Sequence, residues 1–250
     1  IGFAVSFEMD YFNMLNILEL GKVPLFAADR DEQDPLIIAG GPCATFNPEP
    51  LAAFVDAFIV GEGEEVIHEL LDTYYKAKGA GVTRHLLLRE LANIPGVYVP
   101  RFYQPSYNAD NTLAGMVALD GVPARIQRRW VKDLDAYPGE SVIVTKNTEF
   151  EDMYLIEIAR GCGRHCRFCM AGYCFRRPRV RSLDRVAAAL ERAAPLRRKV
   201  GLVGAAISDY PEIDKLCDMI LARGMTLSVA SLRADSLTPR LAEALAASGH

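Results

Sequence analysis

The spacing of apolar residues divides the first eighty residues into alternating helices and strands. Tyr11, Met14, Leu15 and Leu18 follow one another at helical spacing, which predicts an amphipathic helix that ends at Gly21. Other stripes and short apolar runs predict helices at 48–54 and 66–79 and strands at 1–7, 35–39 and 57–60. Strands that alternate with helices in this way predict a parallel sheet with helices on both faces.

From about residue 93 to residue 150 the pattern changes to short β-prone runs interrupted by proline. The runs are 96–99, 116–119 and 142–145, and the prolines are at 95, 100, 105, 123 and 138. Proline is tolerated only at sheet edges and turns, so this segment is predicted to be a connecting arm with a β-hairpin. Trp130 is predicted to anchor the arm.

The last hundred residues return to repeated strand–helix units. Strands are predicted at 154–159, 200–203 and 227–230, and helices at 183–194, 211–221 and from Pro239 onward, after an N-cap at Thr238. Cys217 lies in the apolar stripe of the second of these helices and is predicted to be a packed core thiol.

Composition and charge narrow the class of protein. The chain has 250 residues, of which 50% are hydrophobic and 24% charged, and a formal net charge of −4. These values are ordinary for a globular protein and give no overall attraction to nucleic acid. No apolar run is long enough for a transmembrane helix and no secretion leader is visible, so a cytoplasmic location away from membranes is predicted. The chain opens inside a predicted strand, without Met, so we expect a fragment of a longer protein.

Three of the six cysteines, Cys162, Cys166 and Cys169, form a CxxxCxxC spacing directly after a predicted strand. Such clustering favours metal binding in a reducing compartment over a disulfide framework. Three thiolates can bind three irons of a cubane cluster and leave the fourth iron open to a further ligand. The alternative is a structural zinc cage that adds Cys174, but zinc cages usually pair two short knuckles and a second knuckle is missing.

This spacing, with Phe168 before the last cysteine, resembles the signature of the radical SAM superfamily. The resemblance implies a [4Fe-4S] cluster, S-adenosyl-L-methionine, and an electron donor such as flavodoxin or ferredoxin. It also implies a barrel of six β/α units, of which 151–250 would supply the first half. Residues 1–80 resemble the C-terminal part of the B12-binding-like domain of one branch of the superfamily, through the turns at 40–42 and 61–64.

The resulting fold class is α/β: a partial flavodoxin-like parallel sheet over 1–80, a connecting arm over 81–150, and half of a partial (β/α) radical SAM barrel over 151–250. Whether the complete protein binds cobalamin stays open: the Asp-x-His-x-x-Gly motif of that branch is absent from these residues, but we expect it on a segment before Ile1, so its absence here does not decide the question. The glycine turns have a structural explanation, since glycine permits tight turns and Glu64 and Glu65 favour a helix N-terminus.

The resemblance also implies roles for residues outside the cysteines. Phe168 would lie against the adenine. Gly204 and Ala205, at the end of the second strand, would bind the methionine amino group. The Gly-Gly-Glu motif that is usual at this place is missing, so the contact would come from backbone carbonyls or from Ser208 and Asp209. At the end of the third strand lie Ser231 and Arg233, and Arg233 could pair with the cofactor carboxylate. No catalytic residue is predicted.

Eight arginines and a single acid, Asp184, lie between Arg160 and Arg185. They would form a patch for an anionic substrate, such as tRNA or a phosphorylated metabolite, or else offset the cluster's charge and pair with carboxylates. His165 is predicted to be a spacer in the cysteine loop.

The leading hypothesis is a radical SAM enzyme that cleaves S-adenosylmethionine reductively to a 5′-deoxyadenosyl radical, with methyl or methylthio transfer to RNA or protein as the favoured reaction and the substrate unassigned. The alternatives are a non-catalytic iron–sulfur protein for electron transfer or regulation, and a zinc-stabilised binding module. The 250-residue piece alone is expected to be inactive, because half of the barrel is missing.

Overall fold

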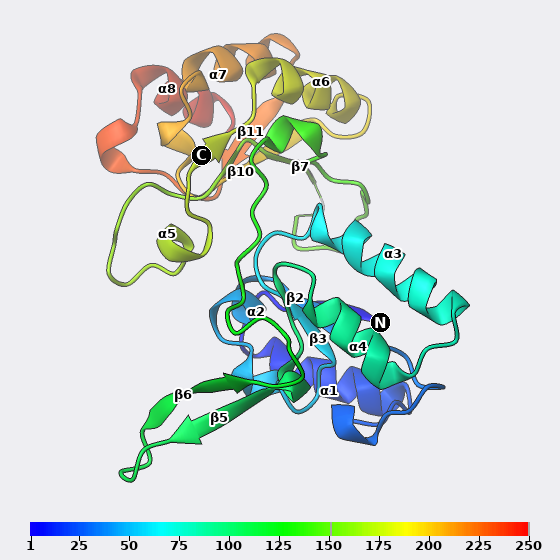
Figure 1. The fold of residues 1–250 in the computed structure, drawn as a ribbon. Helices are drawn as coiled ribbons and strands as arrows, with labels where there is room; N and C mark the ends of the chain where they lie inside the picture. The colour runs from blue at the N-terminus through cyan, green and yellow to red at the C-terminus, as the bar shows by residue number, and fades with distance from the viewer. Residues whose placement is uncertain (151, 250) are drawn as a thin grey trace. The chain divides into compact units, whose positions relative to one another are not determined.

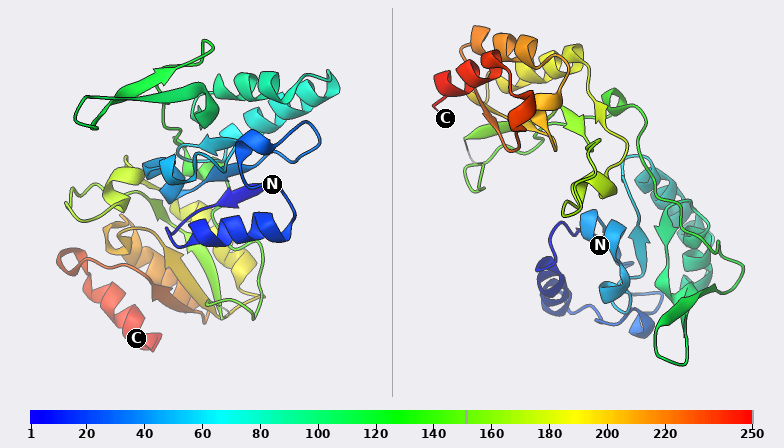
Figure 2. Two further views of the ribbon diagram at one scale, coloured as in Figure 1. Left: turned by 90° about the horizontal axis from the view of Figure 1, so that it is seen from below. Right: turned by 90° about the vertical axis from the view of Figure 1, so that its left-hand side faces the viewer.

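The computed structural model describes residues 1–150 and 152–249. Its contacts divide the chain into two compact units, Ile1–Val131 and Lys132–His250. Both units are drawn in Figure 1, and Figure 2 gives two further views. No helix among the described residues is long and apolar enough to cross a membrane.

The first unit contains a four-stranded sheet in the order β1-β2-β3-β4. Its strands are β1 (Gly2–Ala4), β2 (Ile38–Gly40), β3 (Ala57–Ile59) and β4 (Val97–Tyr98). Strands β1, β2 and β3 are parallel, with Ile38 paired to both Gly2 and Ala57, and β4 is antiparallel to β3. The helices are α1 (Asp10–Leu20), α2 (Pro42–Phe46), α3 (Val66–Gly79) and α4 (Arg84–Ala92), with short 3₁₀ turns η1 (Ala27–Asp29), η2 (Glu49–Leu51) and η3 (Pro100–Phe102).

The sheet buries side chains on both faces, as its sequence predicts. On β3, Ala57 and Ile59 belong to the core shared with α3 and α4, whereas Phe58 packs with Met14 and Leu18 of α1. Successive side chains of a strand point to opposite faces, so a strand covered by helices on both sides must be apolar throughout. The predicted parallel α/β sheet is therefore confirmed.

Several elements between the predicted ones differ from the sequence-based expectation. Helix α2 begins at Pro42 and was not predicted, whereas the helix expected at 48–54 is only the 3₁₀ turn η2. Helix α4 was also missed, although Thr83 caps it by accepting a hydrogen bond from Leu86 N. The strand expected at 142–145 is wrong: this segment is irregular, with Val142 and Ile143 87% and 83% exposed.

The predicted hairpin forms from β5 (Tyr103–Tyr107) and β6 (Leu113–Ala118), which pair antiparallel with a register shift near Tyr107. The hairpin, β4 and α4 all belong to the first unit, which runs to Val131. The sequence had assigned them to an arm over 81–150. They join the unit because β4 completes its sheet and the stripe of α4 enters its core.

The second unit contains three parallel strands in the order β11-β10-β7, which are β7 (Met153–Glu157), β10 (Lys199–Val203) and β11 (Thr226–Val229). Its helices are α5 (Ala171–Cys174), α6 (Leu183–Ala193), α7 (Ile213–Ala222) and α8 (Pro239–Ala247). Short elements complete it: β8 (Ala159–Arg160), β9 (Arg179–Val180), η4 (Leu134–Ala136), η5 (Ile207–Asp209) and η6 (Ala234–Ser236). Within this sheet, β7 lies beside β10 and β10 beside β11, so the strands follow one another in chain order, as in the first three units of a β/α barrel.

The core of the second unit lies between the sheet and helices α6, α7 and α8, which Figure 1 shows on one side of the strands. Tyr154 and Ile156 of β7 enter this core, so Leu155 and Glu157 lie on the opposite face of the strand. Cys217 is fully buried in the core, where burial raises the pKa of its thiol to about 11. It is a core thiol, as predicted.

Candidate functional site

The loop that carries the CxxxCxxC spacing leaves β8 and returns through β9. These two strands pair antiparallel, Ala159 with Val180 and Arg160 with Arg179, so both ends of the loop are held together. Gly161 begins the loop with a φ of 85°, and a Cβ at this position would collide with the carbonyl oxygen of Phe175. Only glycine fits here, because it tolerates both the positive φ and the close approach.

The three loop cysteines are free and accessible to solvent. Cys166 is exposed and Cys162 and Cys169 are partly exposed, whereas the chain's other thiols, at Cys43, Cys174 and Cys217, are buried. The backbone N–H of Cys169 donates to the carbonyl of Cys166 at 3.1 Å, which forms a tight turn between these two residues. The accessible thiols are thus the three that the spacing selects.

The positions of the three thiols distinguish between the metal groups that they could hold. Among the described residues, no three Cys, His, Asp or Glu side chains converge closely enough to hold a single metal ion. A zinc cage needs such convergence, and Cys174 is only 3% exposed. A cubane makes a different demand, because each thiolate binds a separate iron and the sulfurs stand apart. The chemistry of three accessible thiols on one loop fits an iron–sulfur cluster.

Both ends of the loop are tied to one carboxylate, that of Glu157 at the end of β7. Its oxygens accept from Arg160 Nε at 2.8 Å, Arg160 Nη2 at 2.9 Å and Arg181 Nη2 at 2.8 Å. Arg160 precedes the loop and Arg181 follows it. Arg181 is 2% exposed and also donates to the carbonyls of Leu134 and Tyr137. Burial raises the pKa of Glu157, but the two arginines outweigh burial and the pKa is lowered.

Sequence reasoning missed this ion-pair cluster. The available signal was that Glu157 is the one charged residue in an otherwise apolar strand, 154–159. A charge in such a strand calls for a partner, because a buried ion is retained only when it is paired. The partner Arg181 lies 24 residues away in the chain, and the sequence does not identify it.

Arg233, which follows β11, lies in a group of charges next to the cysteine loop. Its guanidinium forms ion pairs with Asp235 and, at 3.5 Å, with Asp209. The hydrogen bond that Arg233 donates to Asp235 raises the pKa of Arg233 most, and electrostatic interactions with Asp209 and Cys162 add to the effect. Ser208 accepts from the backbone N–H of Arg233 at 2.9 Å. The structure therefore brings Arg233, Asp209 and Ser208 together, with Cys162 close by.

The other predicted cofactor residues are also placed by the strand ends. Gly204 and Ala205 follow β10, and the carbonyl of its last residue, Val203, accepts from Ile158 N at 3.0 Å. Ser231 follows β11, and its carbonyl accepts from Ile207 N at 3.1 Å. The C-terminal ends of parallel strands meet at one edge of a sheet. These residues therefore share that edge with the start of the cysteine loop, whereas Phe168, within the loop, is 92% exposed.

Many of the arginines in this segment already have partners. Besides Arg160 and Arg181, Arg164 lies 3.8 Å from an Asp209 oxygen. Arg176 donates to the carbonyl of Gly172 at 2.9 Å and stacks over the ring of Tyr173. Arg176 Nη2 also lies 2.9 Å from Nδ1 of His165, so the predicted spacer packs within the loop. These contacts agree with arginines that organise the loop.

A shallow depression, widely open to solvent, lies beside β7 and β10 in the same unit. Its lining residues are Leu155, Glu157, Arg160, Val203 and 138–141. Leu155 and Glu157 lie on the face of β7 that the helices leave uncovered. The depression therefore occupies the side of the sheet that corresponds to a barrel interior.

Two family models match the chain. The model of the N-terminal region of radical SAM proteins matches residues 1–100, and the radical SAM superfamily model matches residues 156–250. The chain belongs to the radical SAM superfamily, as its cysteine spacing predicts, and matches the models of both its N-terminal region and its core over these residues. A [4Fe-4S] cluster and S-adenosylmethionine are the cofactors of this superfamily.

Two individual proteins extend the comparison. An uncharacterized protein of Methanocaldococcus jannaschii is 30% identical over 246 residues, which cover 95% of this chain and 45% of that protein. The radical S-adenosylmethionine methyltransferase TsrM of Kitasatospora setae, solved with cobalamin and a [4Fe-4S] cluster bound, matches with a TM-score of 0.50 and 17% identity. That match covers 85% of this chain and 40% of TsrM, and it shows a shared fold. The chain thus spans less than half the length of either protein.

Proposed function

We propose that this protein is a radical SAM enzyme in which Cys162, Cys166 and Cys169 hold the [4Fe-4S] cluster. The observation that carries the proposal is the position of the three accessible thiols. They lie on one loop directly after the first strand of three successive β/α units. Active sites of α/β barrels lie at this edge, where the strands end.

The chain's own residues prepare the loop for a metal group. Arg160 and Arg181 fix its two ends on Glu157, and Gly161 permits the sharp departure from β8. The guanidinium of Arg233 places a positive charge near the loop, which suits an anionic cluster. These residues fix the conformation of the loop and place positive charge beside it, and none of them is a proposed cluster ligand.

The bound cluster would supply the electron that cleaves S-adenosylmethionine into methionine and a 5′-deoxyadenosyl radical, and the protein would supply position and exclusion of water. We assign the adenine to the exposed ring of Phe168 and the methionine end to Gly204, Ala205, Ser231 and Arg233, at the strand ends. Arg233 is oriented by Asp209 and Asp235 through Nε and Nη2, which leaves the Nη1 donors of its guanidinium for the cofactor carboxylate. The depression beside Glu157 and Val203 would admit the substrate.

For the reaction that follows, we propose methyl or methylthio transfer, with flavodoxin or ferredoxin as electron donor. Support comes from the superfamily and from the fold shared with a methyltransferase that binds cobalamin. In this chain, Gly41 and Gly61 follow β2 and β3, at the edge where open α/β sheets bind ligands.

The test is anaerobic reconstitution of the complete natural polypeptide with iron and sulfide. We expect bound iron and acid-labile sulfide, which the combined Cys162→Ser, Cys166→Ser and Cys169→Ser variant loses. The matched controls are Cys43→Ser and Cys174→Ser, which should retain the iron. Iron that survives in the triple variant, or zinc that disappears on Cys174→Ser, would contradict the assignment.

Incubation with S-adenosylmethionine and dithionite separates the catalytic from the non-catalytic alternative. The radical SAM enzyme produces 5′-deoxyadenosine, and the triple serine variant does not. A reconstituted protein with a reducible cluster and no 5′-deoxyadenosine would instead be an electron-transfer or regulatory iron–sulfur protein.

A further inference from the structure

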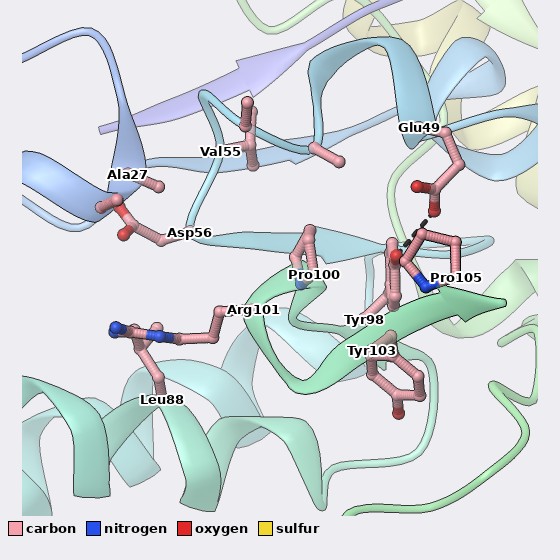
Figure 3. A pocket seen from close by; sticks show the side chains of 13 residues that line it. Ala27, Glu49, Val55, Asp56, Leu88, Tyr98, Pro100, Arg101, Tyr103 and Pro105 are labelled. Atoms are coloured by element: carbon pink, nitrogen blue, oxygen red, sulfur yellow. Dashed lines mark hydrogen bonds between the residues drawn. The ribbon is translucent and has the colours of Figure 1, made fainter. Parts of the chain in front are cut away.

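Two aspartates of this chain each lie between two arginines, and the two arrangements differ in burial and in distance. Asp56 lies in the wall of a cavity in the first unit (Figure 3). Its Oδ2 accepts from Arg30 Nη1 and from Arg84 Nη2, both at 2.9 Å, and its side chain is 1% exposed. A carboxylate that is buried and bonded in this way is a structural partner of the two arginines, because a buried ion is retained only when it is paired.

Asp209, the last residue of η5, has a looser arrangement at the strand ends of the second unit. Its Oδ1 lies 3.5 Å from Nε of Arg233, and its Oδ2 lies 3.8 Å from Nη2 of Arg164. The side chain of Asp209 is 33% exposed and that of Arg164 is 51% exposed. Exposed ion pairs contribute little to stability, so stability alone does not account for a carboxylate at this place.

The backbone around Asp209 is fixed by the neighbouring strand-end loop. Ser208 is 5% exposed, and its Oγ accepts from the backbone N–H of Arg233 at 2.9 Å. The backbone N–H of Ile207 donates to the carbonyl of Ser231 at 3.1 Å. These hydrogen bonds join the loop after β10 to the loop after β11. The carboxylate of Asp209 is therefore held at the edge where the strands end.

Both arginines that face Asp209 belong to the proposed cluster site. Arg164 lies in the cysteine loop, between Cys162 and Cys166. Arg233 lies within electrostatic range of Cys162. Its Nε is buried and has no hydrogen-bond partner among the described residues, so the charge of Asp209 at 3.5 Å is what faces this atom.

The charges of this group balance one another. Arg164 and Arg233 contribute two positive charges, and Asp209 and Asp235 contribute two negative ones. Asp235 is 67% exposed, so solvent screens its charge more than that of Asp209. An iron–sulfur cluster bound by three thiolates is anionic and gains a further negative charge on reduction. Net charge beside a cluster is one of the factors that set its reduction potential.

We propose that Asp209 tunes the reduction potential of the cluster: its negative charge offsets the guanidiniums of Arg164 and Arg233 and keeps the potential low. This inference rests on the proposed function, because it requires a cluster on the three loop cysteines. Without Asp209, excess positive charge would stabilise the reduced cluster, which would then be a weaker electron donor. A strong donor is needed because the proposed reaction is a reductive cleavage.

The test is a redox titration of the reconstituted complete polypeptide, in which the spectrum of the cluster is followed against the applied potential. Asp209→Asn should favour the reduced cluster by roughly tenfold, the effect of one unit charge at moderate range in a partly solvated site, or about 59 mV toward positive potential for a one-electron couple. Asp209→Glu, which retains the charge, should stay close to the parent. Asp218→Asn, at an exposed aspartate of α7 that pairs with Arg240, is the matched control and should not shift the midpoint.

A variant of Arg164 separates the effect of charge from that of loop structure. Arg164→Gln removes a positive charge, so it should shift the midpoint to more negative values, opposite to Asp209→Asn. The double variant should return toward the parent, because the two charge changes cancel. A loop that is only loosened would shift both single variants in the same direction or lose its iron.

The proposal is overturned if Asp209→Asn leaves the midpoint unchanged or makes it more negative. It is also overturned if Arg164→Gln shifts the midpoint in the same direction as Asp209→Asn, or if Asp209→Asn loses the iron that the parent retains. The proposed function is judged on the parent: a parent without a cluster refutes that function and this inference with it. A parent with a normal cluster and an unshifted Asp209→Asn variant refutes this inference alone.

Discussion

Replacement of Glu157 by glutamine should destabilise the second unit strongly, although it changes the shape of the side chain very little. The substitution removes the negative charge opposite Arg181, whose side chain is 2% exposed, while that of Glu157 is 21% exposed. Arg181 would retain only uncharged acceptors, namely the carbonyls of Leu134 and Tyr137 and the amide oxygen of the new glutamine. The residue at position 157 thus determines whether the buried guanidinium of Arg181 has a negative charge opposite it.

The magnitude follows from two limits. Loss of hydrogen bonds to a charged group costs about 1.5–3 kcal/mol, and breaking a fully buried ion pair costs about 3–5 kcal/mol. The pair is partly exposed on the Glu157 side and glutamine still accepts a hydrogen bond, so we expect a loss of about 2–3 kcal/mol. A loss of this size is a large fraction of the ~5–15 kcal/mol that stabilises a typical protein.

The assay is urea unfolding at pH 7 of the parent and the Glu157→Gln variant. Glu243→Gln is the control, because Glu243 is 69% exposed and pairs with Arg240 on the surface of α8. Such surface pairs contribute about 0–1 kcal/mol. A Glu157→Gln variant no less stable than the control would refute the inference that this carboxylate anchors the loop.

The pH dependence gives a second check of the same reasoning. The pKa of Glu157 in the folded protein is lowered from its ordinary value of 4.5, so the stability it contributes is present above that value. This contribution is lost as the pH falls through the lowered pKa. The difference between parent and variant should therefore shrink below about pH 4.5. A difference that persists unchanged at acidic pH would indicate that shape, and not charge, is responsible.

Three further predictions concern other parts of the molecule. Asp56→Ala should cost about 3–5 kcal/mol in urea unfolding, because it leaves two arginines without their shared carboxylate, and a cost below that of surface variants would contradict this. Gly161→Ala should reduce the iron retained after reconstitution, whereas Gly163→Ala, where a Cβ meets only ordinary contacts, should retain it. Thr238→Ala should cost about 1 kcal/mol by removing the N-cap bond to Leu241 N, and an unchanged unfolding midpoint would show that this cap contributes nothing.

The elements that the sequence predicts well are those with local signals. The first helix stops at Gly21 and the last begins at Thr238, because a cap or a stop residue acts through its immediate neighbours. The parallel strands are also found, because a strand buried on both faces is a continuous apolar run.

The expected strand at 142–145 failed for the opposite reason. Val142 and Ile143 have strong β-propensity, yet both are exposed and pair with no neighbouring strand. β-propensity measures fit to a pleated, half-buried surface, so it does not form a strand without such a surface. Helix α4, in contrast, had readable signals in the Thr83 cap and the stripe of Leu87, Leu88 and Leu91. Both signals are local, so the sequence is sufficient to predict this helix.

Within the candidate site, the sequence identifies the proposed ligands but not the residues that support them. Fixed spacing identifies Cys162, Cys166 and Cys169, because all three lie on one short loop. The group around Glu157 joins residues up to 24 positions apart, and the group around Asp56 joins residues 26 and 28 positions apart. Pairing at such distances depends on the fold, and a single sequence does not show which of many arginines meets which carboxylate.

The cysteine loop is fixed at its two ends, where it joins β8 and β9, and is exposed at its tip, around Cys166 and Phe168. A site for an iron–sulfur cluster requires both ordered ligands and access from solution. At the base, Glu157 and the pairing of β8 with β9 remove most of the freedom of the chain where it leaves and rejoins the barrel. Shortening the free segment lowers the entropy lost when three thiolates are brought to one group. At the tip, Cys166 and Phe168 are exposed, so a group that arrives from solution finds its ligands accessible. A loop that is buried along its whole length would exclude the cluster, and a loop that is mobile along its whole length would bind it weakly. The ion pair of Glu157 with Arg181 therefore favours cluster binding because it orders the ends of the loop and leaves the tip accessible.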